Sequence, residues 1–237
     1  MRNVRDWREQ IHFSTEGAPS GLRGPNLWPP IDGWREDLLR LIADLEQAAR
    51  DVLKVFSPDF LPPVEEPYLL LKLIHYLPSQ PRYGVAPHVD FSWITLLLQD
   101  RPGLQFRKPN GEWQDVPHLP GAFIVNIGEI LEYATGGQFK ATPHRVLCSD
   151  QSRISMPFFL NPSLDRVITG SPLPPHEDDE HVHRVFINPP AGDFVFGDAE
   201  WRRKGQGVWC EQCVPPPPTG PTDQRRSAAQ TPPRHDK

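Results

Sequence analysis

Proline is the residue that most limits what this chain can fold into. It occurs 30 times in 237 residues, more than twice the average usage of about 5%. Because proline cannot donate a backbone hydrogen bond and clashes with the preceding helical turn, many long helices are excluded. Residues 214–237 are rich in proline and nearly free of large apolar side chains, so we expect a disordered tail there. Residues 1–33 combine Trp, Gly and Pro without periodicity, which predicts an irregular N-terminal arm.

Helical periodicity is clear in one segment. From Trp34 to Phe56 apolar side chains recur at three- and four-residue steps, and Glu36 and Asp37 suit the first turn of a helix. The pattern predicts a helical segment over residues 34–66 that packs on a core.

Short apolar runs rich in β-branched and aromatic residues, separated by turn residues, follow from Tyr68 onward. This rhythm is typical of a sandwich or barrel. Pro-Asn-Gly at 109–111 predicts a hairpin, and residues 128–137 predict a short helix between two strands. The sequence therefore favours a mainly β domain with flanking helices, with its core over residues 67–200.

Charge and hydropathy exclude several classes of function. The formal net charge is −5 and no concentrated basic face is evident, which argues against binding of nucleic acid. No apolar run approaches the roughly 18 residues that span a bilayer, and the N-terminus lacks the apolar region of a signal peptide. Three cysteines are too few for a secreted disulfide scaffold. We expect a cytoplasmic monomer with reduced thiols.

His88 and Asp90 stand just before an apolar run that reads as a buried strand. In an extended backbone, residues two apart point to the same face, so both side chains can bind one metal ion. The alternative is a polar pair in a turn, where Asp is common. A third ligand has to come from elsewhere, and His144 is the candidate.

His144 also lies close in sequence to an arginine and a serine that suit an anion. If residues 149–152 form a hairpin loop, Val146 pairs with Ser155, and His144, Arg153 and Ser155 project to the same side. Ser155 would then lie roughly 7 Å along the strand from the histidine. That gap fits a dicarboxylate bound to a metal at one end and to the guanidinium and hydroxyl at the other. The alternative for the arginine is a surface salt bridge.

Two histidines and one carboxylate leave about half of the positions of an octahedral iron open, as non-haem iron(II) oxygenases require. An inward-facing guanidinium is costly unless it is paired, and its planar fork matches a carboxylate.

At this point the sequence resembles a known family. Over residues 68–162 it is similar to the non-haem iron(II)- and 2-oxoglutarate-dependent dioxygenases of the isopenicillin N synthase-like type. The matching motifs, in order, are HVD at 88–90, GLQF at 103–106, PGAFIVNIGEILEYATGG at 120–137, ATPHRV at 141–146 and RIS at 153–155.

The resemblance implies a double-stranded β-helix, a jelly roll of the cupin-like kind, that holds iron(II) with His88, Asp90 and His144. It implies an enzyme that oxidises a small organic molecule by hydroxylation, desaturation or cyclisation. Dioxygen would be consumed, 2-oxoglutarate would be converted to succinate and carbon dioxide, and ascorbate would serve as reductant.

The resemblance also implies where the cosubstrate binds. Arg153 and Ser155 would meet the distal carboxylate of 2-oxoglutarate, and Tyr76 matches a tyrosine that often bonds to the same group. The asparagine usual in the family two residues before this tyrosine is Ile74 here.

Two other functions remain open on the residues alone. An isopenicillin N synthase-like iron oxidase that takes electrons from its substrate can keep the arginine and serine without using 2-oxoglutarate. In the family, a strand-containing region precedes the segment that matches residues 22–30, and we expect that this chain begins after that region. The third function is therefore an inactive jelly roll that serves as a binding module.

Two further motifs are expected to have no metal. His176 and Asp178 repeat the His-x-Asp spacing inside a polar, proline-flanked loop. Cys210 and Cys213 resemble half of a zinc site, but no second cysteine pair completes it.

Overall fold

The computed structural model describes residues 6–18, 22–56, 66–78, 83–170 and 194–196. All of them belong to a compact unit that spans Met1–Gly207. The expected tail at 214–237, the second His-x-Asp motif and the cysteine pair lie outside the described residues.

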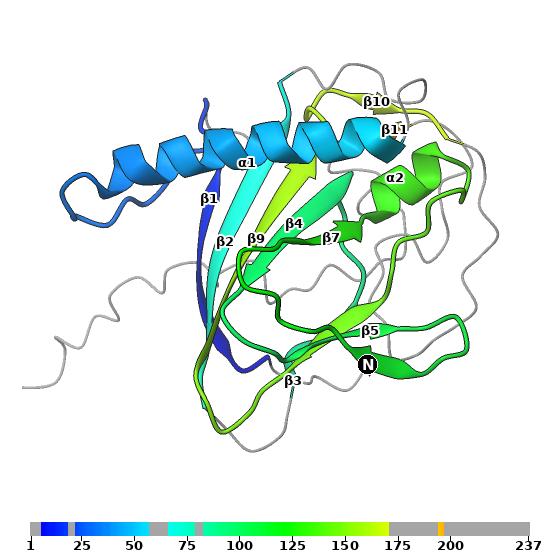
Figure 1. Cartoon of the computed structure of the whole chain (residues 1–237). Coiled ribbons are helices and arrows are strands. Elements are labelled where there is room, and N and C mark those ends of the chain that lie inside the picture. The colour runs from blue at the N-terminus through cyan, green and yellow to red at the C-terminus, as the bar shows by residue number, and fades with distance from the viewer. Residues whose placement is uncertain (1–5, 19–21, 57–65, 79–82, 171–193, 197–237) are drawn as a thin grey trace, which may run out of the picture. The chain divides into compact units, whose positions relative to one another are not determined.

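Two antiparallel sheets form the core of the described chain (Figure 1). The five-stranded sheet contains, in spatial order, β1 (Arg8–Ser14), β2 (Tyr68–Tyr76), β9 (Arg153–Asn161), β4 (Ile94–Gln99) and β7 (Ile124–Ile127). The four-stranded sheet contains β3 (Tyr83–His88), β8 (His144–Leu147), β5 (Leu104–Arg107) and β6 (Trp113–Asp115). A small separate ribbon pairs β10 (Val167–Ile168) with β11 (Phe194–Val195).

From β2 to β9 the chain passes back and forth between the two larger sheets. Strands β2, β4, β7 and β9 lie in one sheet, while β3, β5, β6 and β8 lie in the other. This alternation is the topology of a double-stranded β-helix, so the mainly β jelly roll predicted from the sequence is confirmed.

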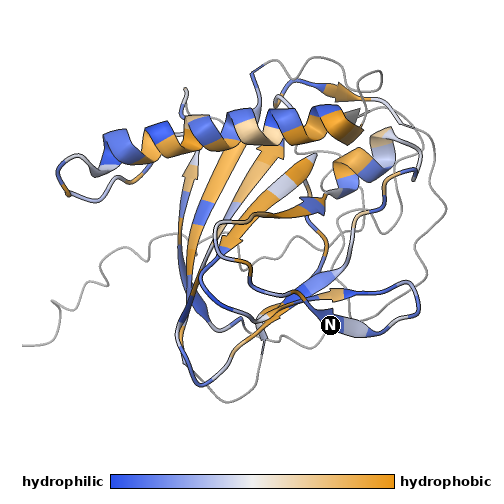
Figure 2. Ribbon diagram, in the orientation of Figure 1, coloured by the Kyte–Doolittle hydropathy of each residue, from blue (hydrophilic) through white to orange (hydrophobic). Residues whose placement is uncertain are grey.

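Helix α1 (Trp34–Phe56) crosses the strands of the five-stranded sheet and covers its outer face (Figure 1). Hydrophobic residues colour the side of the α1 ribbon that faces the sheet, and hydrophilic residues colour the opposite side (Figure 2). The buried side chains of α1, such as Leu45 and Leu53, share a core with Leu96, Phe158 and Leu160 of the sheet. No helix in the described part of the chain is long and apolar enough to cross a membrane.

Two local predictions are also confirmed. Strands β5 and β6 pair antiparallel across the Pro-Asn-Gly turn, and α2 (Glu129–Ala134) lies between β7 and β8. Gly128 precedes α2 at a place where a Cβ would lie 2.1 Å from the carbonyl oxygen of Ser92. Only glycine therefore allows the backbone to approach so closely.

The prediction of an irregular arm over residues 1–33 is wrong for residues 8–14. These residues form β1, which pairs with β2 along its whole length, from Arg8 opposite Tyr76 to Ser14 opposite Leu70. Only Ile11 and Phe13 alternate with polar residues in β1, so the period-2 signal is short.

The predicted hairpin between β8 and β9 is also wrong. Strand β8 pairs with β3 and β5, whereas β9 pairs with β2 and β4. Residues 148–152 therefore cross from one sheet to the other instead of turning back within one sheet. The loop chemistry of Ser and Asp suits both kinds of connection, so it does not distinguish them.

Truncation of Phe158 tests the packing of α1 on the sheet. Phe158 is 0% exposed in the core beneath the helix, and Phe→Ala in such a core costs about 3–5 kcal/mol. Phe158→Ala should therefore lower the free energy of unfolding by that amount in chemical denaturation. Ile154→Ala is the matched control, since Ile154 lies on the same face of β9 but is 54% exposed, and its cost should stay below about 1 kcal/mol. Equal costs for the two variants would contradict the packing described here.

Candidate metal centre

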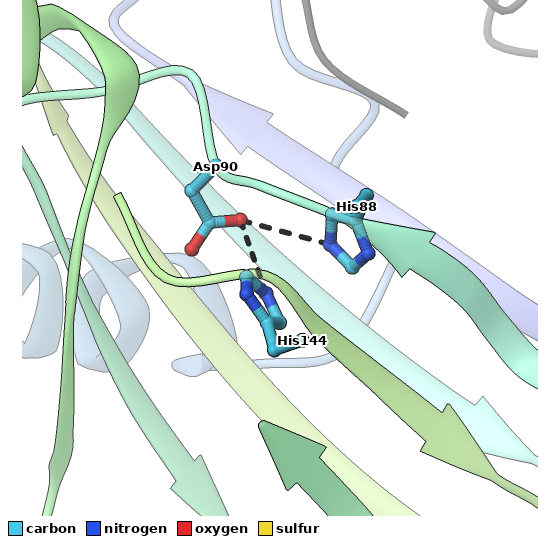
Figure 3. A group of neighbouring side chains, drawn as sticks. All are labelled: His88, Asp90 and His144. Atoms are coloured by element: carbon cyan, nitrogen blue, oxygen red, sulfur yellow. Dashed lines mark ion pairs between the residues drawn. The ribbon is translucent and has the colours of Figure 1, made fainter. Parts of the chain in front are cut away.

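Three side chains that are far apart in the sequence meet at one end of the four-stranded sheet. His88 ends β3 and lies opposite His144, the first residue of β8. Asp90 lies two residues after His88 in the sequence and faces both imidazoles (Figure 3). Its Oδ1 atom lies 3.8 Å from Nε2 of His88 and 3.5 Å from Nε2 of His144. One potential ligand atom from each of the three residues lies within 4.8 Å of the others.

Backbone carbonyls orient both imidazoles. Nδ1 of His88 lies 2.9 Å from the carbonyl oxygen of Ala86, and Nδ1 of His144 lies 3.0 Å from that of Thr142. A carbonyl oxygen only accepts, so each Nδ1 carries a proton and donates it. The Nε2 atoms are thereby turned toward Asp90 as the metal-binding positions, which is the usual outer-shell arrangement of metal-ligating histidines.

The electrostatics of this cluster suit a cation. Burial lowers the pKa of His88 to about 3, and the neighbouring His144 acts in the same direction. Burial by itself would raise the pKa of Asp90, but His144 and His88 hold that pKa below its usual range. Burial likewise opposes protonation of His144, yet the carboxylate of Asp90 raises the pKa of His144 above its ordinary value. The cluster therefore presents an ionised carboxylate and one neutral imidazole.

A second polar cluster lies on the inner face of the five-stranded sheet. Arg153, Ser155 and Tyr76 are 3%, 2% and 3% exposed. Arg153 lies opposite Tyr76 in the register of β2 and β9, with its guanidinium 4.9 Å from the centre of the tyrosine ring. The hydroxyl of Ser155 donates to the hydroxyl oxygen of Tyr76 at 3.4 Å. Three predicted cosubstrate residues are thus neighbours.

Arg153 is held by neutral groups. Its Nε donates to the carbonyl oxygen of Arg101 at 3.1 Å and its Nη2 to Oε1 of Gln99 at 2.6 Å, while Nη1 is buried without a hydrogen-bond partner among the described residues. Burial lowers the pKa of Arg153. No ion pair between it and a described carboxylate is present, so the alternative of a surface salt bridge is wrong.

The two clusters approach each other in a different way from the predicted one. The sequence placed His144, Arg153 and Ser155 on one face of a hairpin, but His144 belongs to the four-stranded sheet and the other two to the five-stranded sheet. Asn126 of β7, in the five-stranded sheet, contacts the metal cluster, because its side-chain amide donates to Oδ2 of Asp90 at 3.3 Å. The structure thus has the candidate metal site on the four-stranded sheet and the buried guanidinium of Arg153 on the five-stranded sheet.

Comparison with known proteins agrees with this geometry. The profile described as "2OG-Fe(II) oxygenase superfamily" matches residues 68–162, the stretch from β2 to just past β9 that contains both clusters. The chain belongs to the 2OG-Fe(II) oxygenase superfamily. The described side chains that could hold its iron are His88, Asp90 and His144.

Individual relatives support the same assignment. The chain is 34% identical to kihadalactone A synthase LFS of Citrus sinensis, over 81% of this chain and 65% of that protein. Among solved structures, JOX2 in complex with 2OG, Fe and JA is 28% identical with a TM-score of 0.56, over 84% of this chain and 60% of that one. A 2OG-Fe(II) oxygenase family protein from Caulobacter crescentus, at 24% identity, shares the fold with a TM-score of 0.67, over 86% of this chain and 72% of that one.

The chain spans about half to two thirds of the length of the first curated relatives that it matches.

The donor set of this cluster fits iron(II). Two imidazole nitrogens and one carboxylate oxygen form the three-ligand arrangement of non-haem iron oxygenases, which leaves positions open for cosubstrate and dioxygen. A structural zinc site would instead be closed by a fourth protein ligand, and none lies in the cluster among the described residues.

Two residues of the site were missed from the sequence. Asn126, which donates to Asp90, lies within the apolar run FIVNI, and Gln99, which accepts from Arg153, ends the apolar strand ITLLLQ. A polar side chain in or directly after an apolar run is the available signal, since burying it is costly unless a partner is present.

Neutralising Asp90 tests the assignment of the metal ligands. Asp90→Asn keeps the shape of the side chain but removes the charge, so affinity for Mn(II) should fall by more than about 100-fold, beyond the loss expected for an outer-shell residue. Isothermal titration calorimetry measures it. Asp115→Asn, on the exposed strand β6, should bind Mn(II) like the wild type. Wild-type affinity in Asp90→Asn would place the metal elsewhere.

Metal binding should also depend on pH. Because Asp90 raises the pKa of His144, a proton competes with the metal ion for its Nε2 atom below that pKa, so affinity for Mn(II) should rise with pH until that pKa is passed. Calorimetric titrations at several pH values, in buffers with different ionisation enthalpies, should show proton release on Mn(II) binding that decreases as the pH rises. An affinity that does not change with pH, with no proton released at any pH, would mean that His144 is not a ligand.

Proposed function

We propose that the chain is an iron(II)- and 2-oxoglutarate-dependent oxygenase that oxidises a small organic molecule. The observation that carries the proposal is the pair of clusters on facing sheets: a three-ligand metal site on one, and on the other a buried guanidinium without a carboxylate partner among the described residues. A keto acid with a second, distal carboxylate satisfies both.

The chemistry of the arginine cluster fits 2-oxoglutarate. An isolated buried cation is strongly unfavourable, and a carboxylate with two oxygens matches the guanidinium fork. Nη1 of Arg153 is a buried donor without a partner among the described residues. The hydroxyl of Ser155, two residues along the same face of β9, bonds to Tyr76, which lies opposite Arg153. In our proposal Arg153 and Ser155 bind the distal carboxylate, with Tyr76 supporting the serine.

Each part of the site then has a physical task. When bound, iron(II) would supply the activation of dioxygen, coupled to decarboxylation of 2-oxoglutarate to succinate and carbon dioxide. Asp90 and the two histidines hold the metal, and Arg153 fixes the far end of the cosubstrate. Apolar side chains that pack in one buried cluster with Tyr76, among them Leu97, Leu104 and Val146, exclude water and so strengthen the charge interactions.

The substrate class rests on similarity alone. Kihadalactone A synthase and the JA-bound JOX2 are relatives whose names refer to small organic molecules. We propose a substrate of this general size for the present chain, with hydroxylation, desaturation and ring closure as the possible outcomes.

Formation of succinate tests the proposal. Purified protein with iron(II), ascorbate, 2-oxoglutarate and a panel of small organic molecules should form succinate well above a His144→Ala control. Oxygen uptake that does not need 2-oxoglutarate would support the iron oxidase instead. Metal binding without any turnover would support the binding module.

Loss of the guanidinium should act on cosubstrate binding. Arg153→Met removes a charge-assisted contact worth about 1.5–3 kcal/mol, so the KM for 2-oxoglutarate should rise about 10- to 100-fold. Arg145→Met is the matched control, since Arg145 stacks 4.1 Å over the ring of Trp113, outside the site. The KM of this variant for 2-oxoglutarate should equal that of the wild type. An unchanged KM in Arg153→Met would remove Arg153 from the cosubstrate site.

A further inference from the structure

Gln99 is the last residue of β4 and lies on the same inner face as the arginine cluster. It is directly opposite Ser155 in the register of β4 and β9. Its side chain is buried, with an exposed fraction of 6%, at the end of the apolar strand ITLLLQ. A buried amide at this position requires partners for its oxygen and its nitrogen.

The contact with Arg153 fixes which way this amide points. Nη2 of Arg153 lies 2.6 Å from Oε1 of Gln99. A guanidinium has donors only, so the amide oxygen must face it and the amide nitrogen must point away from it. The orientation follows from chemistry, although oxygen and nitrogen of an amide look alike.

That orientation leaves two buried donors in the same polar cluster. Nε2 of Gln99 and Nη1 of Arg153 are both buried without a hydrogen-bond partner among the residues that the structure describes. Leaving a buried donor unsatisfied costs about 1–3 kcal/mol, and more for a charged group. A carboxylate, which has two acceptor oxygens, can satisfy both donors.

Elsewhere in the chain, an arginine and a glutamine that are paired in the same way are joined by a carboxylate. On the four-stranded sheet, Nε of Arg145 donates to Oε1 of Gln105 at 2.8 Å, and Nε2 of Gln105 donates to Oδ1 of Asp115 at 2.8 Å. Guanidinium, amide and carboxylate thus form a chain of hydrogen bonds. The pair of Arg153 and Gln99 repeats its first two members and lacks the carboxylate.

We propose that Gln99 is a further binding residue for the distal carboxylate of 2-oxoglutarate. Its Oε1 holds the guanidinium of Arg153 in place, and its Nε2 donates to the carboxylate. This inference rests on the proposed function, because it assumes that a keto dicarboxylate enters the site. It adds a polar contact from β4 to those from β9 and β2.

Gln99→Glu is the sharpest variant, because it brings a carboxylate of the protein to the position beside Arg153. The buried guanidinium gains a partner, so the melting temperature of the metal-free protein should rise. The same carboxylate repels the ligand, so the affinity of the Mn(II)-loaded protein for 2-oxoglutarate, measured by calorimetry, should fall by at least about tenfold. Stability and affinity are thus expected to change in opposite directions.

Gln99→Met covers the case in which the glutamate variant fails to fold. Methionine has a similar length but neither donor nor acceptor, so affinity for 2-oxoglutarate should again fall and the melting temperature should not rise. Gln105→Glu makes the same chemical change beside Arg145, outside the site, and should leave affinity for 2-oxoglutarate unchanged.

2-Oxopentanoate separates a carboxylate contact from a general structural role. It carries the keto acid but lacks the distal carboxylate, so the wild type should bind it more weakly than 2-oxoglutarate. In Gln99→Glu and Gln99→Met that preference should shrink by at least about tenfold, because only the dicarboxylate loses a contact. A merely structural glutamine would weaken both ligands equally, and that result would overturn the inference.

The remaining outcomes distinguish this inference from the proposed function. A wild type that does not prefer 2-oxoglutarate over 2-oxopentanoate would refute the cosubstrate site itself. A wild type that has the preference and a folded Gln99 variant that keeps it would refute only the role of Gln99.

Discussion

The register between β3 and β8 is the constraint on which the rest of the site depends. It sets His88 opposite His144, and the loop after β3 then returns Asp90 to the same point. Because side chains alternate along a strand, a slip of one residue would turn one imidazole to the other face and leave a buried aspartate unpaired. The histidine contacts to Ala86 and Thr142 complete the arrangement by fixing each ring.

The division into two sheets separates two tasks. Two of the three metal ligands come from strands of the four-stranded sheet, and the buried cation comes from β9 of the five-stranded sheet. Helix α1 and the apolar core beneath it stabilise the five-stranded sheet from the face opposite the site. A guanidinium without a carboxylate partner among the described residues can be tolerated there because packing on the opposite face supplies stability that the polar cluster itself does not.

Much of this could be predicted from the sequence, for physical reasons. Local periodicity identified α1, and turn chemistry identified the hairpin of β5 and β6. The metal ligands could be found because His-x-Asp before a strand is a short-range pattern, to which His144 adds a third ligand. The connection from β8 to β9 could not be predicted, since a turn sequence at 149–152 does not reveal which sheet the next strand joins. Strand β1 was missed because only two of its residues, Ile11 and Phe13, alternate as apolar positions.

The most direct test is a crystal structure of the protein loaded with Mn(II) and 2-oxoglutarate. The account predicts one metal ion bound by His88, Asp90 and His144, with the distal carboxylate of the keto acid in contact with Arg153. A metal ion on other side chains, or a keto acid whose distal carboxylate lies away from this guanidinium, would contradict it.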